Sequence, residues 1–66
     1  MKTIILFHTH TGALKFDKIL KKNNIESVLR PVPRHLSSSC GVCIFTDSDL
    51  EGIERIDEIK EVVFED

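Results

Sequence analysis

The strongest constraint on the fold is the apolar run at residues 3–8, which carries hydrophobic side chains in both phases of strand alternation. A strand of this kind is covered on both faces, so it is expected at the centre of a sheet. A chain of 66 residues has room for only one compact domain around such a strand. Residues 1–66 are therefore treated as a single small domain.

A helix is predicted over residues 12–22, directly after the first strand. Thr9 or Thr11 can cap its start, and Asn23 and Asn24 can stop it in a left-handed conformation. The expected buried side of this helix consists of Ala13, Phe16, Ile19 and Leu20.

Two strands are predicted next. Residues 25–32 form an edge strand, because Pro31 and Pro33 cannot lie inside a hydrogen-bonded ladder. Residues 41–46 form a strand whose alternation puts Val42 and Ile44 on one face. The other face takes Cys43 and Phe45.

The C-terminal third predicts a second helix and a last strand. Asp47 or Ser48 can cap the helix, and residues 62–64 form the strand. The inward side chains of this helix are Leu50, Ile53 and Ile56.

The order β-α-β-β-α-β predicts an α+β fold of the ferredoxin-like split βαβ type, an antiparallel four-stranded sheet with two helices on one face. Right-handed crossovers make strands one and two run the same way, with strand three between them. His8, Thr9, His10 and the loop leading to Cys40 are then expected at one end of the sheet.

Composition excludes several classes of function. The net charge of −2 argues against a nucleic-acid-binding protein, although residues 1–46 carry a net +5 and residues 47–66 a net −7. The longest apolar run is far shorter than the roughly 20 residues of a membrane span, and no signal-peptide pattern is present. We therefore expect a cytoplasmic protein with no membrane partner, in which the two cysteines are reduced thiols.

The candidate functional group is the thiol of Cys40. Thiolates form near cations, imidazolium groups and helix N-termini, and Arg34, His8 and His10 are expected at this end of the sheet. His35 lies in the same loop, with an ambiguous role. Ser37, Ser38 and Ser39 supply hydroxyl donors, and Gly41 permits close backbone approach. The alternative is that Cys40 has no chemical role: it would be a small residue at the start of a strand, and the three serines would form a solvent-exposed hairpin.

Cys43 is a second thiol in Cys-x-x-Cys spacing, which also occurs in redox dithiols and zinc sites. On an extended strand the two Cα atoms would lie about 10 Å apart, too far for a disulfide. We therefore expect Cys43 to be a core or interface residue. A zinc site formed by both cysteines with His8 and His10 stays open as an alternative. We expect, however, that the protein binds no metal and no other cofactor.

The chain resembles the small DUF3343 proteins, a family of selenium/sulfur carrier protein-like chains. The resemblance spans nearly the whole chain, and its most specific part is the stretch from Pro31 to Gly41, followed by a hydrophobic strand. Residues that match this motif are Pro33, Arg34, Ser37, Ser38, Cys40 and Gly41. Cys43 departs from the motif, which leaves open a role for Cys43 as a second thiol that resolves the bond formed on Cys40 or receives the atom carried there.

The resemblance implies a thiol that carries sulfur or selenium as a persulfide or selenosulfide between donor and acceptor proteins. Such a protein is a carrier rather than a turnover enzyme. A rival reading is a binding or regulatory ferredoxin-like module, including a homodimer that pairs through its sheet.

Overall fold

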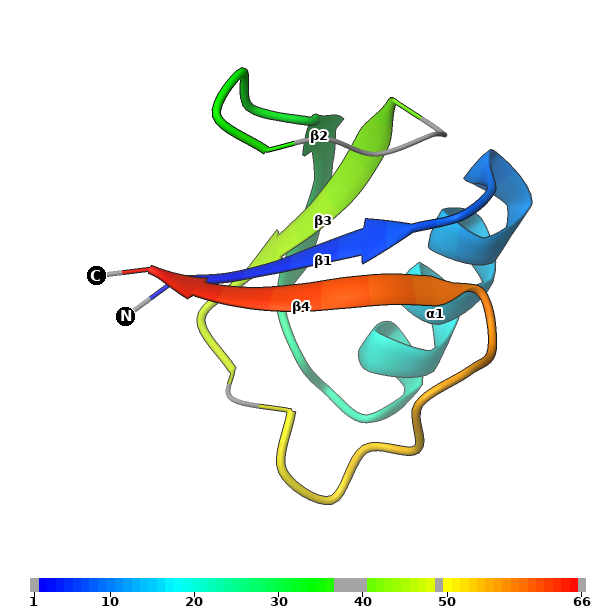
Figure 1. Ribbon diagram of the computed structural model, residues 1–66. Helices are drawn as coiled ribbons and strands as arrows, with labels where there is room; N and C mark the ends of the chain where they lie inside the picture. The colour runs from blue at the N-terminus through cyan, green and yellow to red at the C-terminus, as the bar shows by residue number, and fades with distance from the viewer. Residues whose placement is uncertain (1, 37–40, 49, 66) are drawn as a thin grey trace.

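The computed structural model describes residues 2–36, 41–48 and 50–65, which form one four-stranded sheet and one helix (Figure 1). Strand β1 (Lys2–Phe7) lies inside the sheet, and its residues 3–7 are all buried. The prediction of a central strand covered on both faces is confirmed.

The strand order is β2-β3-β1-β4, and every neighbouring pair is antiparallel. The other three strands are β2 (Ser27–Pro31), β3 (Val42–Thr46) and β4 (Ile59–Glu65). Because β1 and β2 are both antiparallel to β3, they run in the same direction on either side of it. The α+β class and the antiparallel four-stranded sheet are confirmed.

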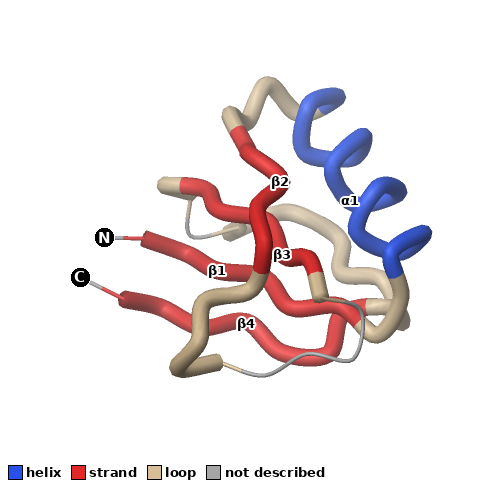
Figure 2. The backbone as a smooth tube through the Cα atoms, turned by 90° about the horizontal axis from the view of Figure 1, so that it is seen from above, coloured by secondary structure: helices blue, strands red, loops and turns tan. Residues whose placement is uncertain are grey.

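Helix α1 (His10–Lys22) connects β1 to β2 and lies on one side of the sheet (Figure 2). Thr9 is the N-cap, and its hydroxyl accepts a 3.0 Å hydrogen bond from the Gly12 backbone N–H. Asn23 is the C-cap, and Asn24 follows in the left-handed region at φ 62°. The helix therefore starts two residues earlier than predicted and stops where predicted.

Two hydrophobic clusters lie on opposite faces of the sheet, as expected for a doubly covered β1. On the helix side, Ile5 and Phe7 of β1 pack with Phe16 and Leu20 of α1. On the other side, Val32, Leu36, Phe45 and Val63 pack against a small buried cluster of Ile4, Leu6 and Cys43. The segment after β2 therefore covers part of the face that carries no helix.

The predicted second helix is wrong for the described residues between β3 and β4, which contain turns and no helix. Leu50 and Gly52 have φ values of 66° and 81°, outside the helical range. The two-helix ferredoxin-like arrangement is therefore not confirmed.

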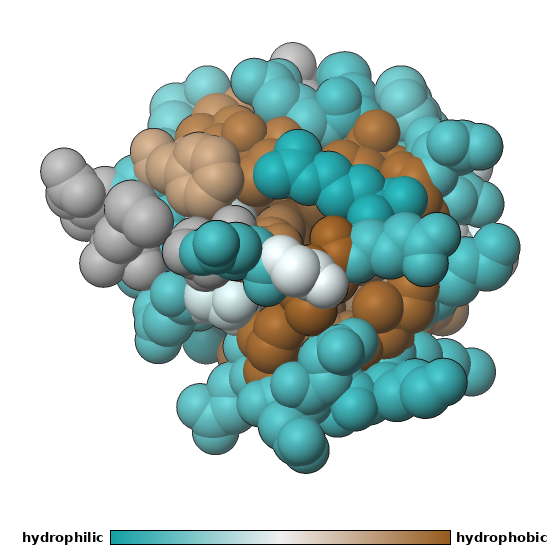
Figure 3. All heavy atoms as spheres, turned by 90° about the horizontal axis from the view of Figure 1, so that it is seen from below, coloured by the Kyte–Doolittle hydropathy of each residue, from teal (hydrophilic) through white to brown (hydrophobic). Residues whose placement is uncertain are grey.

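The same segment still buries the side chains that were expected to face inward. Leu50 is 3 % exposed, and Ile53 and Ile56 pack against the helix-side cluster. Figure 3 looks onto this side of the molecule and shows hydrophobic side chains at its centre, framed by polar ones. An irregular segment thus performs part of the covering role that was expected of a helix.

Within the described residues, no helix has the length and apolar character needed to cross a bilayer.

Candidate functional site

Four of the candidate residues, Ser37, Ser38, Ser39 and Cys40, lie outside the described residues. Their flanks are described on both sides. The first flank is a turn in which the Leu36 N–H donates to the Pro33 carbonyl at 3.0 Å. Leu36 packs on the face of the sheet opposite α1, while Arg34 is exposed to solvent.

The second flank is Gly41, which is exposed and has a φ of 76°. Its carbonyl accepts a 3.2 Å hydrogen bond from the Val32 N–H. The backbone pairing of β2 with β3 therefore extends one residue pair beyond the two strands, up to the residue that follows Cys40. A Cβ built on Gly41 meets no atom of the described residues within 4 Å. Glycine is therefore favoured here by its backbone conformation rather than by crowding from described residues.

The end of β1, the start of α1 and the start of β3 lie at the same end of the sheet (Figure 1). The register pairs Leu6 with Cys43, so the chain leaves β1 where it enters β3. His8 and His10 are both exposed at this end, and the His8 N–H donates to the Glu58 carbonyl at 2.8 Å. The chain topology thus brings two imidazoles and a helix N-terminus to the end of the sheet that carries Gly41.

His35 makes a contact that sequence patterns did not indicate. Its Nε2 lies 2.6 Å from Oε2 of Glu65, at the end of β4. This pair connects the turn after β2 to the opposite edge of the sheet, across the face without a helix. His35 therefore has a defined partner within the fold, and Glu65 is a residue of this region that sequence reasoning missed.

Cys43 lies in the core, as its expected strand position predicted. Its side chain is 0 % exposed and packs with Ile4 and Leu6. The Sγ donates a weak 3.8 Å hydrogen bond to the Pro31 carbonyl. A thiol in this environment reacts with an outside reagent only after the sheet opens.

The described residues contain no group of three or more His, Cys, Asp and Glu side chains that could hold a metal ion. The zinc alternative requires Cys43, whose side chain is buried and packs with Ile4 and Leu6. The described part of the chain thus offers nothing in support of that alternative.

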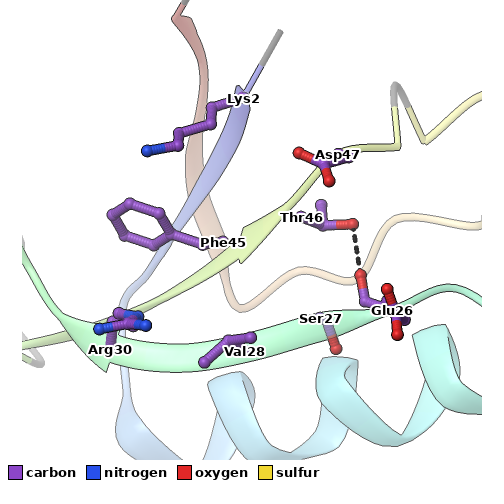
Figure 4. A pocket seen from close by; sticks show the side chains of 8 residues that line it. All are labelled: Lys2, Glu26, Ser27, Val28, Arg30, Phe45, Thr46 and Asp47. Carbon is purple, nitrogen blue, oxygen red and sulfur yellow. Dashed lines mark hydrogen bonds between the residues drawn. The ribbon is translucent and has the colours of Figure 1, made fainter.

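A groove of about 610 Å³ lies along β2 and the end of β3 (Figure 4). Figure 4 shows the Phe45 ring between the side chains of Lys2 and Arg30. The other lining residues are Glu26, Ser27, Val28, Thr46 and Asp47. Sequence reasoning did not indicate this groove, because its charges come from three separate strand ends.

Comparison with known families gives one match, which covers nearly the whole chain. The family model described as "Putative Se/S carrier protein-like" matches residues 2–66. No curated protein and no solved structure matches the chain.

Proposed function

Because the chain belongs to the Se/S carrier protein-like family, we propose that it carries one sulfur or selenium atom on Cys40. The observation that supports this choice of thiol is the burial of Cys43. The chain has two cysteines, and the side chain of Cys43 is 0 % exposed within the core. Cys40 is therefore the thiol that we assign to exchange with other proteins.

The proposed loading step is a thiol exchange in which no external oxidant takes part. The Cys40 thiolate attacks the terminal sulfur of a persulfide on a donor protein, and a new S–S bond forms. The donor's own S–S bond breaks, and the donor cysteine leaves as a thiolate. Cys40 then holds the persulfide Cys40–S–SH, or the selenosulfide Cys40–S–SeH when the donor's terminal atom is selenium.

Unloading follows the same chemistry in reverse order. A nucleophile of the acceptor protein attacks the outer sulfur or selenium atom, and the Cys40 thiolate is the leaving group. The chain returns to its starting state, so the protein is a carrier between a donor and an acceptor protein. Reduced thiols are required throughout, which fits a cytoplasmic setting.

Positive charge near the thiol supports both steps, since the thiolate is the reactive form. Arg34 is exposed at one flank of the candidate segment, and His8 and His10 are exposed at the end of the sheet where the other flank begins. We assign these side chains to stabilising the thiolate. The hydroxyls of Ser37, Ser38 and Ser39 are assigned to hydrogen bonds with the outer atom of the load.

The test is intact-mass spectrometry after incubation with a cysteine desulfurase and cysteine. Wild type should gain the mass of one sulfur atom, and a reductant should remove it. Cys40→Ser should gain none. Cys43→Ala is the matched control and should load as wild type does, because a buried thiol takes no part.

The proposal is overturned if wild type gains no reductant-labile sulfur, or if Cys40→Ser loads to the same extent as wild type. Circular dichroism of each variant confirms that loading is compared between folded proteins.

A further inference from the structure

The outer edge of β2 presents backbone groups that no described strand uses. β2 is the last strand of the sheet on its side. The Val32 N–H points toward β3, because it donates to the Gly41 carbonyl. Backbone direction alternates along a strand, so Ser27 and Leu29 direct their main-chain groups outward, away from β3. Such an edge is a template for another strand.

Two apolar side chains at the centre of this edge strand are exposed to solvent. Val28 is 51 % exposed and Leu29 is 36 % exposed. Natural sheets protect edges with prolines and charged side chains, and here these residues, Glu26, Arg30 and Pro31, stand at the two ends of the strand. The centre of the strand, from Ser27 to Leu29, stays open to pairing.

The charges on β2 are arranged for pairing with an identical strand. Glu26 and Arg30 are both exposed and lie two residues on either side of Val28, on the same face. In an antiparallel pair centred on Val28, Glu26 of each copy stands opposite Arg30 of the other. The edge is thus complementary to itself.

We propose that two copies of this chain pair antiparallel through β2, with the twofold axis at Val28. Ser27 of each copy then forms a hydrogen-bonded pair with Leu29 of the other, and each such pair exchanges both N–H···O bonds. The two Val28 side chains meet at the axis, beside the groove that contains Phe45. The two sheets join into one continuous sheet.

The alternative registers are poorer. Centring the pair on Leu29 sets Ser27 opposite Pro31, which has no N–H, and moves Glu26 away from Arg30. Centring it on Ser27 sets Leu29 opposite Ile25, whose N–H already donates to the Leu20 carbonyl. Neither register brings the opposite charges together, so the Val28-centred register is favoured.

This interface does not depend on the carrier proposal, because it uses no residue of the segment that contains Cys40. A protein that dimerises without loading sulfur would overturn only the carrier proposal. A protein that loads sulfur as a monomer would overturn only the dimer.

The test is sedimentation equilibrium in reductant, at concentrations reaching the millimolar range. Wild type should pass from the mass of one chain to that of two. Glu26→Lys and Arg30→Glu each set like charges opposite each other twice, so each should weaken self-association about tenfold or more. Lys22→Glu reverses an exposed charge at the end of α1 and should leave association unchanged.

The decisive sample is an equimolar mixture of Glu26→Lys and Arg30→Glu. Each charge of one variant then faces an opposite charge on the other, so the mixture should associate about as well as wild type. Leu29→Pro removes an outward N–H while keeping the β3 ladder, and should yield a folded monomer. The proposal is overturned if wild type stays monomeric, if the single variants associate as wild type does, or if the mixture associates no better than either variant alone.

Discussion

The hydroxyl of Ser27 donates a 2.7 Å hydrogen bond to Oδ1 of Asp17, which connects the first residue of β2 to the middle of α1. The other carboxylate oxygen accepts a 2.8 Å hydrogen bond from Lys21 Nζ. Asp17 is 8 % exposed, so its charge is held at the boundary between helix and sheet. The contact fixes the position of the edge strand relative to α1.

The first prediction concerns the pH dependence of this contact. Burial by itself raises the pKa of Asp17, but hydrogen bonds from Lys21 and Ser27 and the charge of Lys21 outweigh it, so the pKa lies below its ordinary value. A lowered folded-state pKa contributes stability above about pH 4 that is lost as the pH falls through the folded pKa.

Asp17→Asn should therefore lower the free energy of unfolding by about 1–3 kcal/mol at neutral pH and flatten its decline in acid. Urea denaturation at several pH values measures both effects. Glu54→Gln removes an exposed carboxylate and is the control, with stability close to wild type throughout. An unchanged acid dependence in Asp17→Asn would contradict the assignment.

A second prediction separates two candidate helix caps. The sequence allowed Thr9 or Thr11, and the structure assigns the capping hydrogen bond to Thr9. Thr9→Ala should destabilise the protein by about 1 kcal/mol, whereas Thr11→Ala, at an exposed helical position, should change stability by less than about 0.5 kcal/mol. Thermal melts of both variants measure this difference, and equal losses would argue against the cap.

The cap illustrates what local sequence signals can specify. Helix α1, its stop at Asn23, the edge position of β2 and the two faces of β3 follow from short-range signals such as capping, proline placement and alternation. The second predicted helix fails because apolar spacing at Leu50, Ile53 and Ile56 is compatible with an irregular segment as well as a helix. The spacing of these apolar residues predicts that their side chains are buried, but it does not determine the conformation of the backbone that carries them.

Long-range contacts were beyond the reach of sequence patterns. His35 and Glu65 are separated by 30 positions, and their pairing depends on how the turn after β2 lies across the sheet. The edge complementarity of Glu26 and Arg30 likewise depends on which main-chain groups of β2 face outward, and the long-range hydrogen bond from the Val32 N–H to the Gly41 carbonyl gives that direction. The assignment of Cys40 rests on motif and family, with the burial of Cys43 as its structural support.

A third prediction concerns the close contact between α1 and the end of the segment before β4. A Cβ built on Gly12 would overlap the side chain of Glu58. Gly12→Ala should therefore destabilise the protein by about 1–3 kcal/mol, despite the better helix propensity of alanine. Urea denaturation measures the loss. A gain in stability would show that Glu58 moves aside at little cost.

The last prediction compares the two thiols directly. In the native protein, alkylation of Cys43 requires opening of the core and should proceed roughly a hundredfold or more slower than alkylation of an exposed thiol. Cys40→Ser should therefore lose the fast phase of alkylation, whereas Cys43→Ala should keep it. In denaturant both cysteines should react at similar rates, since burial no longer protects Cys43.

Arg34→Gln should shift the pH profile of the fast phase upward, because a nearby cation favours the thiolate. A fast phase that titrates near pH 8.5 in both wild type and Arg34→Gln would mean that Cys40 is an ordinary thiol, and the carrier assignment would then lose its electrostatic support.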